Sequence, residues 1–163
     1  MNKKLLSILG AIIGLIVVLI FAGIGGQVGK EVGKAAFTPS KPSQKEIEAK
    51  LIEGFEKGAK QVNATAPTMV DEDTRMDKAT VGPGARVTYH YTFPKYSSRD
   101  VDSGWIISNL RPVVKSNVCV SKDMKPSLQY GGVYSFSYSG SDGVHIASFQ
   151  VDRNDCGFPK ITP

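Results

Sequence analysis

Two cysteines carry the clearest chemical potential in this sequence. Cys119 and Cys156 are its only cysteines, and 36 residues lie between them. They form no Cys-x-x-Cys motif, which argues against a redox enzyme or a zinc ribbon, and no local base marks either thiol as a nucleophile. In a cytosolic domain such cysteines would stay reduced, whereas in an exported domain they would pair. We expect a disulfide and an exported domain.

An acidic run is the second candidate for chemistry. Asp71, Asp73 and Asp77 surround Arg75 at the start of a predicted strand, and carboxylates beside a cation can bind a small ligand or exchange protons. Calcium is disfavoured, because a calcium loop starting at Asp71 would place Met76 where glycine is required. Solvated or locally paired charges are the simpler interpretation. These four residues remain a possible polar site, and the sequence predicts no catalytic residue, metal or cofactor.

The other polar residues form no recognisable catalytic set. His90 and His145 fall on the solvent side of predicted strands, but two histidines without a third ligand rarely bind a metal. Asn63 begins an Asn-Ala-Thr sequon, a pattern that is common by chance. The strand tyrosines alternate with polar residues, which predicts packing under helices rather than stacking on a ligand; they are Tyr89, Tyr91, Tyr134 and Tyr138.

The first elements that must position these residues are a helix and a hairpin. Ser43 and Glu46 have capping-box spacing, and apolar residues then recur at helical intervals to about residue 62. A two-residue period follows over residues 73–93 and is interrupted by Gly-Pro-Gly at 82–84. This pattern predicts a β-hairpin with one buried face.

A second helix and a second hairpin complete the predicted domain. The helix is expected to start near Ser97, where Asp100 completes another box-like spacing, and to be kinked or divided at Pro112. Alternating residues on both sides of a turn at 141–143 predict the hairpin. The order helix, hairpin, helix, hairpin indicates an α+β fold, with a four-stranded antiparallel sheet and helices on one face.

The N-terminal segment has a different composition. Residues 5–29 contain 25 consecutive uncharged positions, which as a helix would span roughly 37 Å and cross a bilayer. A cleaved signal peptide usually has a shorter apolar core and an Ala-x-Ala site, so we favour an uncleaved anchor. We therefore expect a cytoplasmic start, transmembrane helix and glycine-rich exit over 1–36, a linker over 37–43 and an exported domain over 44–163.

Glycines in this segment recur at four-residue spacing. Such repeats place small residues on one helix face and allow close helix packing, which predicts possible self-association through the membrane helix. The alternative is that the later glycines only mark where the helix leaves the bilayer. The residues concerned are Gly10, Gly14, Gly25, Gly29 and Gly33.

Charge excludes one class of partner. The chain has 20 basic and 15 acidic residues, and removing Lys3 and Lys4 leaves 18 against 15, a net charge of +3 for the rest. That excess is too weak to indicate nucleic-acid binding. Positive charges flank the apolar segment on both sides, so orientation rests mainly on the cysteines. We expect an inner-membrane protein with its N-terminus in the cytoplasm and its domain in the periplasm or outside the cell.

A longer pattern adds a resemblance. The sequence contains Met-Val-Asp at 69–71, Thr-Arg-Met-Asp at 74–77, a Pro-Gly turn, Tyr-His-Tyr-Thr at 89–92 and two late cysteines. It resembles a group of small bacterial membrane-anchored envelope proteins. The resemblance implies an envelope location and assigns no site residues.

These observations favour a non-enzymatic, single-pass envelope protein. Its exported domain is expected to bind another protein or to support assembly of an envelope complex. Two alternatives remain: a small-ligand binder or enzyme using the acidic region, and a membrane oligomer built on the glycine repeat.

Overall fold

The structure is a computed structural model that describes residues 42–159. Within those residues, no helix is long and apolar enough to cross a membrane. The predicted transmembrane helix and the five glycines of its repeat lie outside the described residues, as do most of the linker and the last four residues. The predicted domain boundaries therefore stay predictions.

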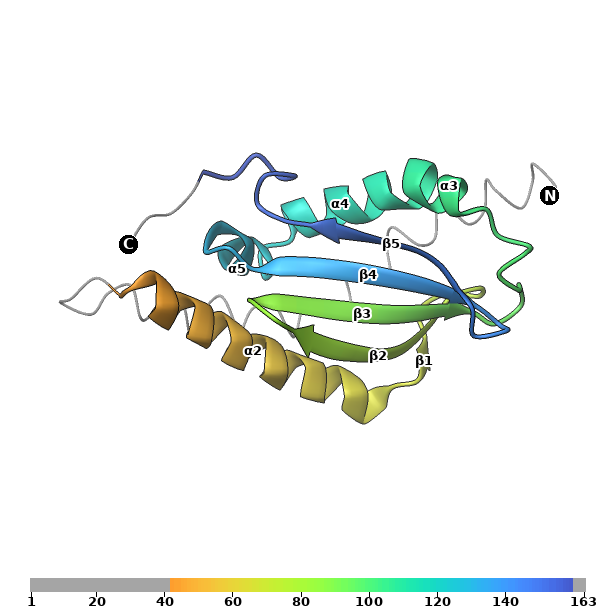
Figure 1. The fold of residues 1–163 in the computed structure, drawn as a ribbon, viewed down its shortest axis with the longest axis horizontal. Helices are drawn as coiled ribbons and strands as arrows, with labels where there is room; N and C mark the ends of the chain where they lie inside the picture. Colours follow the sequence, from red (N-terminus) through yellow and green to blue (C-terminus); the bar gives the residue numbers. More distant parts are fainter. Residues whose placement is uncertain (1–41, 160–163) are drawn as a thin grey trace.

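Helices and strands follow one another in the order given below and shown in Figure 1. The first half contains α2 (Gln44–Thr65), β1 (Thr68–Met69), β2 (Arg75–Gly82) and β3 (Arg86–Phe93). A helical connection follows, made of α3 (Ser103–Trp105), the π-helical turn η1 (Ile106–Leu110), α4 (Arg111–Val120) and α5 (Lys125–Gln129). The chain ends with β4 (Val133–Gly140) and β5 (His145–Val151).

The sheet has five strands in the order β1-β2-β3-β4-β5 and is mixed. Both predicted hairpins are confirmed, because β2 pairs with β3 and β4 pairs with β5 in antiparallel register. The prediction of a four-stranded antiparallel sheet is wrong in two respects. The two-residue β1 adds a strand beside β2, and the central strands β3 and β4 are parallel.

The parallel pairing follows from the connection between the hairpins. Residues 94–132 leave one end of β3, run back along the sheet as helices and return to the end where β3 began, so that Arg86 pairs with Val133 and Phe93 with Gly140. Parallel strands need a long crossover of this kind. A two-residue period gives the buried face of a strand but not its direction, so the alternation alone leaves this pairing open.

One face of the sheet is buried, and the helices pack on it. Alternate residues of β3, β4 and β5 belong to a single core with residues of α2 and α4. Phe55 of α2 lies edge-on to Tyr134 of β4, with ring centroids 5.4 Å apart. The strand tyrosines are all within 3% of full burial, which confirms that they are core residues: Tyr89, Tyr91, Tyr134 and Tyr138.

The start of α2 is the predicted capping box. The backbone N–H of Ser43 donates to Oε2 of Glu46 at 2.7 Å, and the N–H of Glu46 donates to Oγ of Ser43 at 3.3 Å. Gly54 and Gly58 are both buried. They weaken the helix intrinsically, and their burial on the sheet side indicates that packing stabilises it.

The second predicted helix begins later than expected and is not divided. Ser97 and Asp100 do bond, but in a turn, and the helix begins at Ser103 with Asp102 as its cap. Pro112 lacks the N–H of an ordinary helical residue, and its ring would crowd the preceding turn. The chain widens into a π-helical turn just before it, where the N–H of Arg111 donates to the carbonyl of Ile106.

Candidate functional site

The acidic residues form separate pairs rather than one cluster. Nε of Arg75 lies 2.6 Å from Oδ1 of Asp77, and the hydroxyl of Thr92 on β3 donates to Oδ2 of the same carboxylate at 2.6 Å. Asp73 pairs separately with Nζ of Lys95 at 3.0 Å, a contact that raises the lysine pKa. Two of the four predicted residues, Arg75 and Asp77, are thus brought together.

The other two residues shape the turn before β2. Oδ1 of Asp71 accepts the backbone N–H of Asp73 at 2.8 Å. Oδ2 of Asp71 and Oγ1 of Thr74 are buried and have no hydrogen-bond partner among the described residues, an arrangement that costs free energy. Residues 42–159 contain no group of three His, Cys, Asp or Glu side chains that could hold a metal ion. Three of the four candidate residues, Asp73, Arg75 and Asp77, are engaged in ion pairs within the chain.

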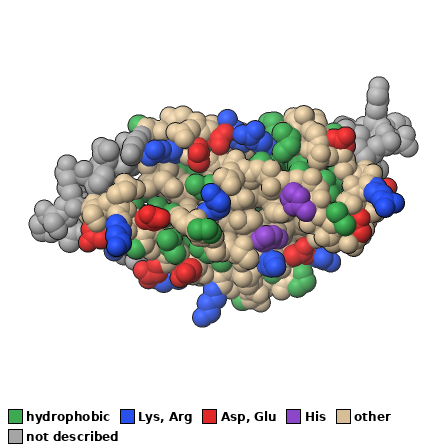
Figure 2. Space-filling model, in the orientation of Figure 1, with side chains coloured by type: hydrophobic (Ala, Val, Ile, Leu, Met, Phe, Trp, Pro, Cys, Tyr) green, Lys and Arg blue, Asp and Glu red, His purple; other side chains and the backbone are tan. Residues whose placement is uncertain are grey.

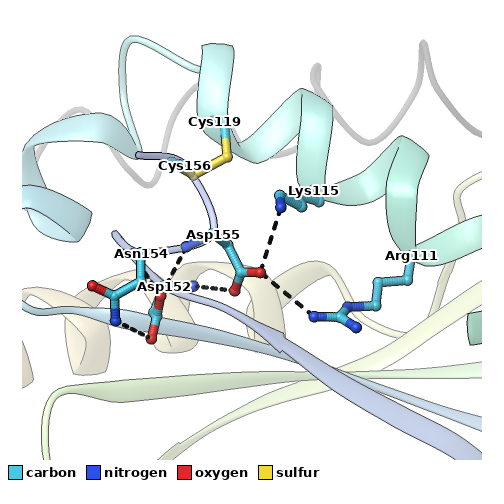
Figure 3. The surroundings of a disulfide bond; sticks show 7 residues. All are labelled: Arg111, Lys115, Cys119, Asp152, Asn154, Asp155 and Cys156. Atoms are coloured by element: carbon cyan, nitrogen blue, oxygen red, sulfur yellow. Dashed lines mark hydrogen bonds and ion pairs between the residues drawn. A yellow bond between two sulfur atoms is a disulfide. The ribbon is translucent and has the colours of Figure 1, made fainter. Parts of the chain in front are cut away.

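The cysteines form a disulfide that fastens the C-terminal end of the domain to α4 (Figure 3). The two Cα atoms are 5.2 Å apart, across a sequence separation of 37. Beside the bond, Asp155 lies 3.5 Å from Arg111 and 3.6 Å from Lys115, both on α4. These ion pairs and the disulfide hold residues 152–156 against the helix, so this region is explained by its structural role.

The opposite face of the sheet is not covered by any described helix. Its central rows consist of small hydroxyl side chains and one histidine, and its charged residues lie toward β2 and the strand ends. We call it the open face, defined by Thr80, Thr88, His90, Thr92, Ser135, Ser137, Ser139, Ser148 and Gln150. Figure 2 looks onto this face and shows both histidine side chains on it.

The two histidines do not form a joint site. His90 lies on β3 and His145 on β5, with β4 between them. Nε2 of His90 lies 2.9 Å from the hydroxyl of Thr80, and burial together with nearby Lys78 lowers the histidine pKa. Each atom satisfies the other in this hydrogen bond, so the contact is explained as part of the polar face.

The two edges of the sheet differ in how they are protected. On β2, the side chain of Asn63 donates from Nδ2 to the carbonyl of Ala79 at 2.9 Å and accepts the Ala79 N–H at 2.7 Å. This amide occupies the edge as a neighbouring strand would, and such caps block edge-to-edge association. Sequence reasoning missed this role, because the sequon motif gives no sign that Asn63 lies beside β2.

The outer edge of β5 has no such cap. No backbone hydrogen bond joins that edge to another segment within residues 42–159. The strand reads His-Ile-Ala-Ser-Phe-Gln-Val and contains neither a Lys, Asp or Glu nor a proline. Edge strands are usually protected by such residues, so β5 offers free backbone donors and acceptors for pairing.

No family model matches this sequence, and no curated protein matches it either. Solved structures do share its fold. A predicted secreted protein of Pseudomonas aeruginosa is 20% identical, with a TM-score of 0.55, over 72% of this chain and 99% of that one.

Two pilotins of type II secretion systems also match. AspS from Vibrio cholerae is 16% identical with a TM-score of 0.52, and EpsS from Vibrio vulnificus is 15% identical with a TM-score of 0.53. Each match covers 67% of this chain and 94% of the pilotin. At these identities the similarity is one of fold: residues 42–159 adopt an α+β architecture also found in a predicted secreted protein and in two secretion-system pilotins.

Proposed function

We propose that this chain is a membrane-anchored envelope protein whose exported domain binds another protein and so supports assembly of an envelope complex. The observation that carries the proposal is the fold shared with two type II secretion pilotins. The disulfide supports an oxidising compartment, where such bonds persist. The apolar N-terminal segment and the resemblance to small membrane-anchored envelope proteins support the anchor and the inner-membrane location.

The open face is the surface that we assign to this partner. It is uncovered by described helices, and its centre is poor in charge, as the central part of a protein interface usually is. Its hydroxyl groups favour a partner surface that offers hydrogen bonds rather than a charged patch. By contrast, the exposed side of α2 is dense in lysine and glutamate, and these charged side chains favour contact with solvent over burial in an interface.

Site-specific photo-cross-linking of the full chain in its native membrane tests this function. A photoreactive residue would replace Thr88 or Gln150 on the open face, or Glu56 or Lys60 on the exposed side of α2 as matched controls. We expect one and the same foreign protein to be captured from both open-face positions and from neither control. Equal capture from α2, or no foreign adduct at all, contradicts the proposal.

The acidic region supports the second candidate, a small-ligand site. Its specific observation is the pair of buried, unpartnered oxygens on Asp71 and Thr74. A ligand that donates hydrogen bonds to them would raise the Tm of the wild-type chain but not that of Asp71→Asn. A metabolite screen by thermal shift in which no compound separates the two proteins would remove this candidate.

A further inference from the structure

The outer edge of β5 is an interaction surface of defined chemistry. Unpaired N–H and C=O groups along an edge are satisfied best by another extended strand. The opposite edge of the sheet is protected, because Asn63 caps β2 at Ala79 and β1 pairs with the first residues of β2. Only β5, within residues 42–159, offers a full-length strand without an edge cap.

The sequence of β5 fits a second copy of itself. Residues directly opposite each other in an antiparallel pair lie on the same face of the sheet. Two copies that overlap fully would place Ser148 opposite Ser148, with Ala147 opposite Phe149 and Ile146 opposite Gln150. Core residues of the two copies then meet at positions 147 and 149, while at each end the exposed His145 lies opposite the buried Val151. No like charges face each other, because the strand contains no Lys, Arg, Asp or Glu.

A shift of one residue would not work. Such a shift would set Ser148, which is exposed, opposite Phe149, which is 7% exposed and stacks on Phe136 in the core. Polar and apolar faces would then be exchanged across the junction. The face pattern therefore excludes shifts by an odd number of residues. Among the registers that remain, the one centred on Ser148 gives the longest overlap of the two strands.

The helix beside β5 has a surface that suits the same arrangement. The helical segment 103–120 runs alongside β5 (Figure 1), and both η1 and α4 contact that strand. Its two charged residues, Arg111 and Lys115, have side chains that are 42% exposed, and both pair with Asp155. Its most exposed residues are uncharged; they are Ser103, Gly104, Ile107, Ser108, Asn109, Pro112, Ser116 and Val120. Among described residues, three of the four exposed large hydrophobics belong to this segment or directly precede β5: Ile107, Val120 and Val144.

A second sheet joined at β5 would bring its own helix 103–120 to the same side of the extended sheet. Depletion of charge and exposed apolar groups are typical of protein interfaces. α2, whose exposed side is dense in lysine and glutamate, would stay at the outer ends. We infer that two copies of this chain pair antiparallel along β5, centred on Ser148, into one continuous sheet. This inference stands independently of the foreign partner proposed above.

Cysteine cross-linking of the full chain in native membranes tests the register. In Ser148→Cys the two new thiols would sit on residues whose Cβ atoms are about 4.5 to 5.5 Å apart, within reach of a disulfide. In the control Gln150→Cys the equivalent residues would be offset by about 14 Å, since each residue advances about 3.4 Å. Both side chains are exposed, so the fold tolerates either change.

We expect mild oxidation to link at least fivefold more Ser148→Cys than Gln150→Cys into a covalent dimer of this chain. Mixing differently tagged Ile146→Cys and Gln150→Cys copies should give a mixed dimer that neither variant gives alone. Because the readout is position-specific, association through the N-terminal segment would not mimic it. Equal linking at 148 and 150, no linking at 148, or capture there of a foreign protein in place of a second copy overturns the inference.

Discussion

Asn63 provides a stringent test of how this sheet is protected. Its side chain makes two hydrogen bonds with the backbone of Ala79, at 2.9 and 2.7 Å, although residue 63 itself is exposed. Neutral hydrogen bonds contribute about 0.5 to 1.5 kcal/mol each. Because Asn63 is exposed, truncating its side chain opens this edge to water. We therefore expect Asn63→Ala to lower the free energy of unfolding by about 1 to 2 kcal/mol.

The matched control is Gln61→Ala, two residues earlier on α2. Gln61 is also exposed and makes no side-chain hydrogen bond within the described residues, and both variants gain the higher helix propensity of alanine. For a domain of this size, 1 kcal/mol corresponds to roughly 3 to 6 °C in Tm. Asn63→Asp should be intermediate at neutral pH, because a carboxylate accepts the Ala79 N–H but cannot donate to its carbonyl.

Thermal unfolding of the full chain in a mild detergent gives the Tm, and amide hydrogen exchange gives a local readout. Exchange at Ala79 should accelerate in Asn63→Ala, while core amides such as that of Tyr89 change only with global stability. If Asn63→Ala and Gln61→Ala share the same Tm and the Ala79 amide stays protected, the edge-cap reasoning is refuted.

Three further predictions concern the disulfide, a crowded glycine and acid. Replacing both cysteines by alanine should lower the free energy of unfolding by about 4 kcal/mol, from the chain entropy of a 37-residue loop, as measured by urea titration. Gly140→Ala should lower the free energy of unfolding by about 1 to 3 kcal/mol, because the new Cβ would collide with the backbone of Ser98. Gly82→Ala is the control, since its new Cβ would have nothing within 4 Å. Equal stabilities of the two variants in calorimetry would contradict this prediction. Hydrogen bonds from Ser43 hold the pKa of Glu46 below its ordinary 4.5. Their contribution to the stability of the folded domain is therefore full above about pH 4.5 and is lost as the pH falls through the lowered pKa. Between pH 6 and pH 2, the free energy of unfolding should therefore decrease less for Glu46→Gln than for the wild type.

Local patterns predicted most of the individual elements. The capping box at Ser43, the Gly-Pro-Gly turn and the alternation around Tyr89 each depend on residues within a few positions of one another, so sequence spacing specifies them. The pairing of Cys119 with Cys156 was also predictable, because a two-cysteine exported domain permits only one intramolecular disulfide. Pro112 showed that the helix would be disturbed, but its neighbours decided that the disturbance is a π-helical turn.

The acidic region shows where local reasoning ends. Spacing placed Asp77 beside Arg75, and these two residues do pair. The other partners, Thr92 for Asp77 and Lys95 for Asp73, come from β3 and the turn after it. Which cation or hydroxyl meets each carboxylate depends on strand register. The sequence could therefore indicate these residues and the pairing of Arg75 with Asp77, but not their partners from other elements.

The sequence by itself determined the first helix, the two hairpins and the buried face of their strands, because those follow from short-range periodicity. Only the tertiary structure decided that β3 and β4 run parallel, that Asn63 caps one edge of the sheet and that the outer edge of β5 is unpaired. These features join residues far apart in the chain, such as Asn63 with Ala79 and Arg86 with Val133. A periodic pattern records which face of a strand is apolar, but strand direction and edge position are set by how the connecting segments pack across the sheet.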